Sequence, residues 1–230
     1  MATEPINLLD KTGFVQLLGT FGDDLTVVNA ARVSFAKESH EMTLADEKLI
    51  NYLAKHNHNS PFFHPQIRFR LKMPIFVARE WYRHQIGFAR NEVSRRYVDS
   101  PPECWVPDVD DLRQRDKNLK QGSKDTPVEG ADYLHMIVKN HTDGCVSLYN
   151  HLLQQNVAPE VARCVLPQSM MTEFIETGSL AAYARLYGLR NDSHAQKEIR
   201  IYAQKVGDLL SAKFPISWKA LTQHEHSAST

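Results

Sequence analysis

The residues best suited to do chemistry are crowded between positions 79 and 97, in the stretch REWYRHQIGFARNEVSRRY. Guanidinium groups share this stretch with an imidazole, two carboxylates and aromatic rings; its charged residues and histidine are Arg79, Glu80, Arg83, His84, Arg90, Glu92, Arg95 and Arg96. A guanidinium is permanently charged and its planar fork of donors fits a phosphate, so the cluster favours phosphate binding. A solvated helix face with ordinary ion pairs is the alternative that a charge run alone leaves open.

The rest of the composition is neutral. The chain has 230 residues, which is enough for one domain with a substantial core, and lysine plus arginine equals aspartate plus glutamate at 27 each. A general binder of nucleic acid or of a membrane surface would be more basic, so we expect neither partner. The arginines are therefore concentrated in one place rather than abundant.

Cysteine and histidine usage predicts no metal site. Cys104, Cys145 and Cys164 are odd in number, far apart and without the spacing of zinc ligands, and the eleven histidines lie in different local settings. The first residues lack a basic-then-apolar signal pattern, and no apolar run is long enough to span a bilayer. A cytoplasmic protein without a disulfide framework is expected.

Two predicted elements lead into the arginine-rich stretch. Residues 66–73 alternate apolar and basic side chains, which predicts a half-exposed antiparallel strand. Pro74 suits the first position of a helix that runs through the start of the stretch and ends at Gly87. Residues 92–98 are then expected to return as extended chain.

Helical periodicity, combined with start and stop signals in the sequence, predicts further helices. They cover residues 44–56 after an N-cap at Thr43, residues 131–153, residues 179–187 between an N-cap at Ser179 and a stop at Gly188, and a last helix opened by a capping box of Ser193 and Gln196. Residues 106–130 are rich in charge, proline and glycine, and we interpret them as a surface excursion from a single domain over residues 1–230.

The arginine-rich stretch resembles the signature of flavin-dependent thymidylate synthases, which is Arg-His-Arg, seven residues, Ser, and then Arg-Tyr. This chain has Arg83-His84-Gln85, eight residues, Ser94, and then Arg96-Tyr97. Gln85 stands where the family has its second arginine and one residue is inserted. Arg90 supplies the missing charge, or no residue does.

Other segments typical of the same family lie before and after this stretch, in the correct order along the chain. They are Ala31-Arg32-Val33-Ser34-Phe35, Pro61-Phe62-Phe63-His64, the segment EVARCVLP with Arg163, and Leu189-Arg190-Asn191-Asp192-Ser193-His194-Ala195-Gln196. Taken alone, Ser34 is a loop hydroxyl, His64 is more typical of a core residue, and Cys164 is more typical of packing than of a nucleophile. The resemblance is what gives these segments a functional interpretation.

The resemblance implies two sets of binding residues. Those expected to bind dUMP are Glu80, Arg83, Glu92, Val93, Ser94, Arg95, Arg96, Arg163 and Arg190. Those expected to bind FAD are Ser34, His64, Gln66, Arg83, His84, Gln85, Glu92, Ser179, Arg185 and His194, with Ser179 and Arg185 standing where the family has asparagines. Arg190 is expected to be catalytic by stabilising charge along the N3-to-O4 edge of uracil, whereas Ser94 is expected to bind phosphate rather than act as a nucleophile.

The resemblance also implies an α+β fold, with a mainly antiparallel sheet flanked by helices, in a homotetramer whose active sites are shared between subunits. The implied reaction is the reductive methylation of dUMP to dTMP, with methylenetetrahydrofolate as carbon donor, FAD as hydride carrier and NADPH as reductant. One alternative is a related enzyme that installs another one-carbon group, such as hydroxymethyl. The other is a non-catalytic module that binds nucleic acid, which the neutral net charge disfavours.

Overall fold

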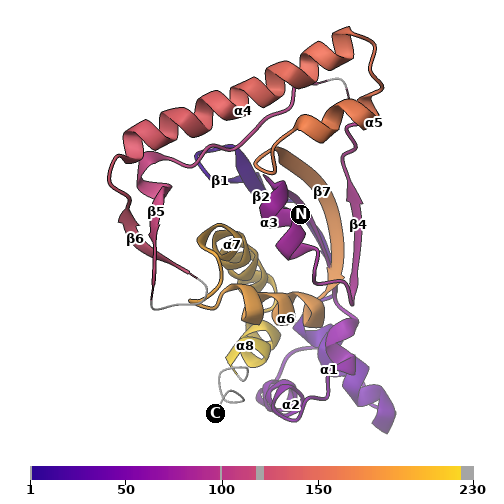
Figure 1. Cartoon of the computed structure of the whole chain (residues 1–230). Helices are drawn as coiled ribbons and strands as arrows, with labels where there is room; N and C mark the ends of the chain where they lie inside the picture. Colours follow the sequence, from indigo (N-terminus) through magenta and orange to yellow (C-terminus); the bar gives the residue numbers. More distant parts are fainter. Residues whose placement is uncertain (1, 99, 118–121, 224–230) are drawn as a thin grey trace.

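A five-stranded sheet with antiparallel pairing throughout forms the centre of the computed structural model, which describes residues 2–98, 100–117 and 122–223 (Figure 1). In spatial order the strands are β1 (Ile6–Leu8), β2 (Gly13–Phe21), β3 (Gln66–Pro74), β7 (Met171–Ser179) and β4 (Phe88–Glu92). β4 therefore forms one edge of the sheet and pairs with β7. The predicted antiparallel strand over residues 66–73 is confirmed.

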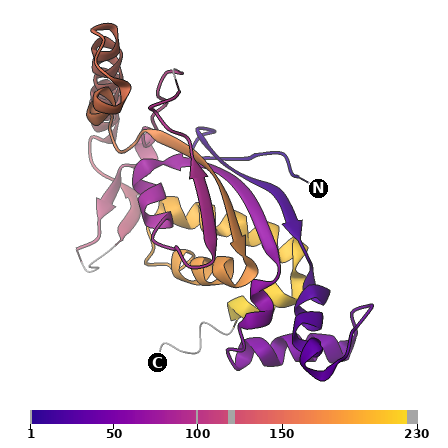
Figure 2. The ribbon, with the colours of Figure 1, turned by 90° about the vertical axis from the view of Figure 1, so that its right-hand side faces the viewer.

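Helices cover one face of the sheet, because the strands turn their apolar side chains to that face. Along β3, Ile67, Phe69 and Leu71 are fully buried, whereas Arg68 and Arg70 are exposed on the other face. The covering helices are α3 (Ile75–Trp81), α6 (Leu180–Arg190) and α7 (Lys197–Lys213), and Figure 2 shows α7 behind the strands. The last helix, α8 (Pro215–Gln223), packs against α6, α7 and α2 (Leu44–Lys55). Sheet and helices share one hydrophobic core.

Two further helices, α1 (Asp24–Arg32) and α2 (Leu44–Lys55), pack at one end of the sheet, beside the short turns η1 (Val33–Phe35) and η2 (Ser60–Phe63). The predicted N-cap of α2 is confirmed, since Thr43 accepts a hydrogen bond from the backbone N–H of Asp46.

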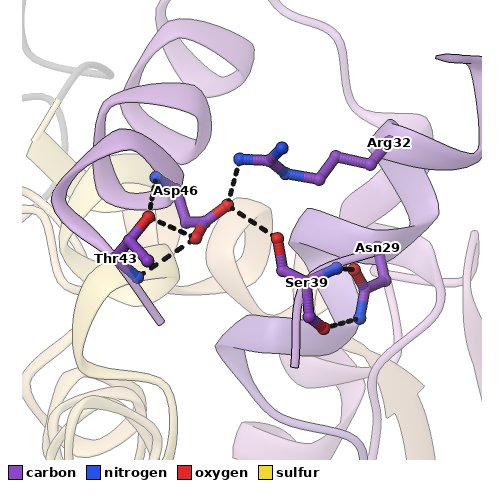
Figure 3. A network of polar contacts seen from close by, with 5 residues as sticks. All are labelled: Asn29, Arg32, Ser39, Thr43 and Asp46. Carbon is purple, nitrogen blue, oxygen red and sulfur yellow. Dashed lines mark hydrogen bonds and ion pairs between the residues drawn. The ribbon is translucent and has the colours of Figure 1, made fainter. Parts of the chain in front are cut away.

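A polar network joins these two helices (Figure 3). The Asp46 carboxylate accepts hydrogen bonds from Ser39 Oγ at 3.1 Å and from Thr43 Oγ at 2.6 Å, and it pairs with Arg32 at 2.5 Å. Asn29 exchanges two hydrogen bonds with the backbone of Ser39. The network fixes the end of α1 and therefore the turn that carries Ser34.

The segment of residues 106–130 holds structure of its own. It contains the turn η3 (Val109–Asp111) and a hairpin of β5 (Arg113–Arg115) and β6 (Ser123–Pro127). The long helix α4 (Ala131–Gln154) follows, confirming the predicted helix, and then come α5 (Pro159–Ala162) and the turn η4 (Arg163–Val165). In Figure 1, α4 runs across one end of the molecule, away from α7 and α8.

Several predicted boundaries were wrong. α3 ends at Trp81, and Gly87, at φ +85°, instead turns the chain into β4. The extended segment is 88–92 rather than 92–98, because the chain turns where the N–H of Tyr97 bonds to the carbonyl of Ser94.

The helical stop and capping signals near the C-terminal end also failed. α6 continues through Gly188 to Arg190, and α7 begins after Gln196, whose side chain makes no cap bond and donates instead to Glu198. Ser193 therefore takes no part in a capping box. The described residues contain no helix that is both long and apolar enough to cross a membrane.

Candidate active site

A pocket of about 810 Å³ opens between the end of α3, the start of α7 and the β5–β6 hairpin. Its titratable lining is mostly cationic and consists of Arg79, Glu80, Arg83, Arg113, Asp125, Arg190, His194, Lys197 and Arg200. Guanidinium groups on several elements converge here, so the pocket suits an anionic ligand. Four predicted site residues, Glu80, Arg83, Arg190 and His194, lie in this lining.

Arg190, the last residue of α6, is held by the end of α3. Its Nε donates to His84 Nε2 at 3.0 Å, and its Nη2 donates to the backbone carbonyl of Glu80 at 3.3 Å. Its Nη1 lies 3.6 Å from the Glu80 carboxylate, which is one third exposed. Two helices that meet only in the folded protein therefore fix the direction of this guanidinium.

His84 is uncharged at neutral pH in these surroundings. Burial lowers the pKa of its imidazole to about 4, and the positive charges of Arg190, Arg185 and Arg90 act in the same direction. The side chain is only 8% exposed. A neutral imidazole can accept the hydrogen bond that Arg190 offers.

Arg90 does not supply the charge that Gln85 removes from the family signature. Arg90 sits opposite Glu176 in the pairing of β4 with β7, and its Nε forms an ion pair with that fully buried carboxylate. Trp81 Nε1 also donates to both carboxylate oxygens of Glu176, at 3.1 and 3.2 Å. Arg90 is therefore largely buried and is already engaged in an ion pair within the sheet.

The second half of the signature lies apart from the pocket. The Glu92 carboxylate accepts a hydrogen bond from Thr172 Oγ, and Ser94 Oγ accepts one from the backbone N–H of Arg96 at 3.3 Å. None of the described pocket lining comes from residues 92–97 or from Arg163 on η4. The predicted phosphate ligands thus form two groups within one chain. Arg83 precedes β4 and lines the pocket, whereas Ser94, Arg96 and Arg163 follow β4 and do not.

The remaining predicted nucleotide residues also follow β4. Val93 is 41% exposed, and Arg95 Nη1 donates to the carbonyl of Ser100. Arg163 is exposed, and its Nε donates to the carbonyl of Glu160 at 3.3 Å. These side chains therefore lie on an outer surface of the chain.

The predicted flavin residues near the first helices lie beside a second pocket of about 480 Å³. His64 lines this pocket together with residues of α1 and Val33, and Ser34 is the next residue along. Gln66 is near by in sequence, and its amide donates to the carbonyl of Phe63 at 2.7 Å.

The other predicted flavin residues surround the turn between α3 and β4. Ser179 is buried and its hydroxyl caps α6, as predicted from its position before that helix. Arg185 donates to the carbonyl of Ile86 at 2.6 Å, and Gln85 is exposed in the same turn. His194 is also exposed and pairs with Asp192 at 2.8 Å. The structure brings Arg185 to the turn that holds Gln85 and places His64, with the neighbour of Ser34, at another pocket.

Sequence reasoning missed several residues of the first pocket. Arg79 belonged to the charged stretch but received no role, and Gln168 and Arg200 lie outside every motif. Arg113 of the hairpin pairs with Glu198 at 2.7 Å, so the hairpin is fastened to the start of α7. Only the charge of residues 106–130 could have indicated this contact, and charge alone is typical of a solvated loop.

The fold and the pocket together define an α+β protein with an antiparallel sheet and a cationic pocket, between the end of α3, the start of α7 and the β5–β6 hairpin, that suits an anionic ligand. The sequence family described as "Thymidylate synthase complementing protein" matches residues 16–216. The chain belongs to this family.

Relatives that match nearly the whole chain support this family assignment. A flavin-dependent thymidylate synthase of Thermosipho africanus is 37% identical over 223 residues, covering 93% of this chain and 92% of the relative. The enzyme of the same name from Thermus thermophilus is 37% identical over 219 residues, covering 95% and 78%. The crystal structure of a UMP/dUMP methylase, PolB from Streptomyces cacaoi, bound with 5-Br dUMP, is similar at a TM-score of 0.82 and 29% identity, covering 92% of this chain and 95% of that one.

Proposed function

We propose that this chain is a flavin-dependent thymidylate synthase that converts dUMP to dTMP by reductive methylation. The observation that carries the proposal is the guanidinium of Arg190, held by α3 at the wall of a cationic pocket in a member of this family. The relatives bear the name of that activity, and the structurally similar PolB was solved with a dUMP analogue.

Arg190 is suited to activate the pyrimidine. C5 of uracil is a weak nucleophile until electron density is pushed into the ring, and a fixed cation beside the N3-to-O4 edge stabilises that charge. Glu80 lies next to Arg190 and is placed to orient the nucleotide. Because Arg190 is already oriented by the fold, little reorganisation accompanies the reaction.

The phosphate of dUMP would be held by guanidinium groups and a hydroxyl. Arg83 contributes from the pocket, whereas Ser94, Arg96 and Arg163 contribute from the outer surface beyond β4, flanked by Val93 and Arg95. A bidentate contact from arginine to phosphate gives both charge and direction. Because Arg83 lines the pocket and the other three residues do not, we propose sites shared between subunits.

The long helix α4 supports assembly into a homotetramer. Much of its apolar surface has no cover within the chain, and its exposed large apolar residues are Tyr133, Leu134, Met136, Ile137 and Leu148. Exposed apolar surface of this extent is typical of protein interfaces. The exposed apolar surface of this helix is therefore available to another subunit rather than to the chain's own core.

FAD is the cofactor implied by the family, and the residues present fit it at two places. His64 lines the second pocket, with Ser34 next to the lining residue Val33 and Gln66 two positions after His64, while His84, Gln85 and Arg185 lie in or contact the turn from α3 to β4. When bound, the flavin would supply hydride to the nucleotide, with NADPH as reductant and methylenetetrahydrofolate as carbon donor. Glu92 and His194, which carry accepting and donating groups, complete the proposed flavin contacts.

The test is the mass of the nucleotide recovered after the purified chain is incubated with dUMP, FAD, NADPH and methylenetetrahydrofolate, with UMP in a parallel reaction. Gain of a methyl group on dUMP supports the proposal, and gain of a hydroxymethyl group replaces it with the related one-carbon transfer. Unchanged dUMP without flavin retention, together with a salt-dependent gel shift, would favour a nucleic-acid module. Arg190→Ala is the control and is expected to retain flavin while its turnover falls to a small but measurable fraction of the parent's.

A further inference from the structure

The end of α3 holds the Arg190 guanidinium on three sides. A guanidinium has five N–H groups, and in the described part of the chain three contacts engage Arg190: with the imidazole of His84, the carbonyl of Glu80 and the carboxylate of Glu80. The carboxylate contact, at 3.6 Å, is an ion pair without a direct hydrogen bond, so three N–H groups are left for a ligand. All three belong to the terminal nitrogens of a side chain that lines the pocket, so their direction depends on how firmly Nε is held.

The imidazole makes the firmest of these side-chain contacts. Arg190 Nε lies 3.0 Å from His84 Nε2, whereas the Glu80 carboxylate is 3.6 Å away and one third exposed. A separation of 3.6 Å is too long for a direct hydrogen bond, and solvent weakens an exposed ion pair. His84, by contrast, is buried.

A neutral acceptor has an advantage over a carboxylate at this position. A close carboxylate would orient Arg190 but would also neutralise the charge that the uracil needs. A neutral imidazole accepts the hydrogen bond and leaves the full positive charge of Arg190 for the ligand. The charged groups that act on His84 agree, since Arg190 and Arg185 on α6 and Arg90 on β4 all disfavour a second positive charge beside them.

We infer that His84 is a positioning residue for Arg190: its unprotonated Nε2 fixes the guanidinium so that its free N–H groups face the pyrimidine. This inference rests on the proposed function and goes beyond the flavin contact expected of His84. It requires the proton of the neutral imidazole to be on Nδ1, because Nε2 has to accept.

The first experiment reads the tautomer without substrate or flavin. In chain labelled with ¹⁵N at histidine, the His84 signals, assigned by their loss in His84→Gln, should show a protonated Nδ1 and an unprotonated Nε2 between pH 6 and 8. His84→Gln places a neutral carbonyl near the position of Nε2, and His84→Leu removes the acceptor while keeping an apolar side chain of similar size. A signal with Nε2 protonated, or a doubly protonated ring at neutral pH, would overturn the inference whether or not the chain makes dTMP.

The second experiment is kinetic, at saturating flavin. We expect His84→Leu to lower kcat by about 10- to 100-fold, short of the loss typical for removing a transition-state donor, with a smaller change in the KM for dUMP. His84→Gln should recover most of kcat. Because His84 acts through Arg190, the double variant His84→Leu/Arg190→Ala should be no slower than Arg190→Ala alone.

Additive losses in the double variant would show that His84 acts on something other than Arg190, and equal losses in His84→Gln and His84→Leu would show that the acceptor is unimportant. Either result overturns the inference. Failure of the proposed function itself looks different, because the unsubstituted chain would then form no dTMP while the tautomer could still be observed.

Discussion

Replacing Glu176 by glutamine tests how the edge strand β4 is held against the sheet. Glu176 is fully buried on β7, faces Arg90 across the strand pair, and accepts two contacts from the indole N–H of Trp81. Glutamine has nearly the same shape, and its single carbonyl oxygen can accept from both Arg90 and Trp81. The substitution therefore removes the negative charge while keeping much of the hydrogen bonding.

The expected loss of stability in Glu176→Gln comes from the Arg90 cation, which is left without a negative partner. The Arg90 side chain is only 14% exposed and is enclosed by the rings of Tyr82 and Phe88, at 5.3 and 4.7 Å from the ring centres. Removing one partner of a buried pair costs about 3–5 kcal/mol, and we take the lower end because the hydrogen bonds survive. For a chain of this size about 3 kcal/mol corresponds to a fall in melting temperature of roughly 6–12 °C.

A matched control lies three residues away on the same strand. Glu173 pairs with Arg70 on β3, but on the exposed face of the sheet, where the two side chains are 30% and 46% exposed. Glu173→Gln should cost about 0–1 kcal/mol because solvent screens the pair. Both variants are measured by scanning calorimetry at one protein concentration, since association shifts the melting temperature.

The double variant Glu176→Gln/Arg90→Leu completes the test. Removing the orphaned cation should recover part of the loss, so the double variant should be more stable than the sum of the two single changes predicts. If Glu176→Gln melts within 2 °C of Glu173→Gln, an amount at which roughly 1 kcal/mol or less separates them, Glu176 and Arg90 do not act as a buried charge pair.

Two other substitutions probe single contacts. Hydrogen bonds from Thr43 hold the pKa of Asp46 below its usual value. The ionised carboxylate therefore contributes to stability above about pH 4, and this contribution is lost as the pH falls further. The urea midpoints of Asp46→Asn and the parent chain should converge at that lower pH. A Cβ on Gly207 would lie 2.4 Å from the ring of Tyr187, so Gly207→Ala should lower the free energy of unfolding by about 1–3 kcal/mol. The control is Gly144→Ala on α4, where a Cβ meets no atom within 4 Å. In the same urea titration it should raise the free energy of unfolding by up to about 1 kcal/mol.

Local signals predicted the elements that local signals control. The alternation of residues 66–73 specified a strand with one buried face, and Thr43 and Ser179 capped helices where a hydroxyl precedes an apolar run. Gly188 failed as a stop because α6 is continued by contacts that no local pattern contains. Arg190, two residues later, is held by α3, more than a hundred positions earlier in the chain.

The candidate site was predictable as a set of residue types but not as an arrangement. The family landmarks identified Arg83 and Arg190, which do meet at one pocket. They did not indicate that Arg90 would pair with Glu176, since that contact depends on the register between β4 and β7. Nor did they separate Ser94 from Arg83, because a sequence motif does not show that a strand lies between two of its members.

The position of that strand bears on how the site is assembled. Arg83 precedes β4 and lines the pocket, whereas Ser94 follows β4 and is absent from the lining. If both residues contact one phosphate, we expect them to come from two copies of the chain.

Mixing two inactive variants tests whether the two halves of the signature act from two copies of the chain. In a mixture of Arg83→Ala and Arg96→Ala chains, unfolded and reassembled together, a shared site can combine an intact Arg83 from one copy with an intact Arg96 from the other. With random assembly at equal amounts, roughly a quarter of the sites would be whole, and turnover should rise to about that share of the parent's. If both arginines act within one chain, every site carries one defect, and the mixture should turn over no faster than the average of the two variants.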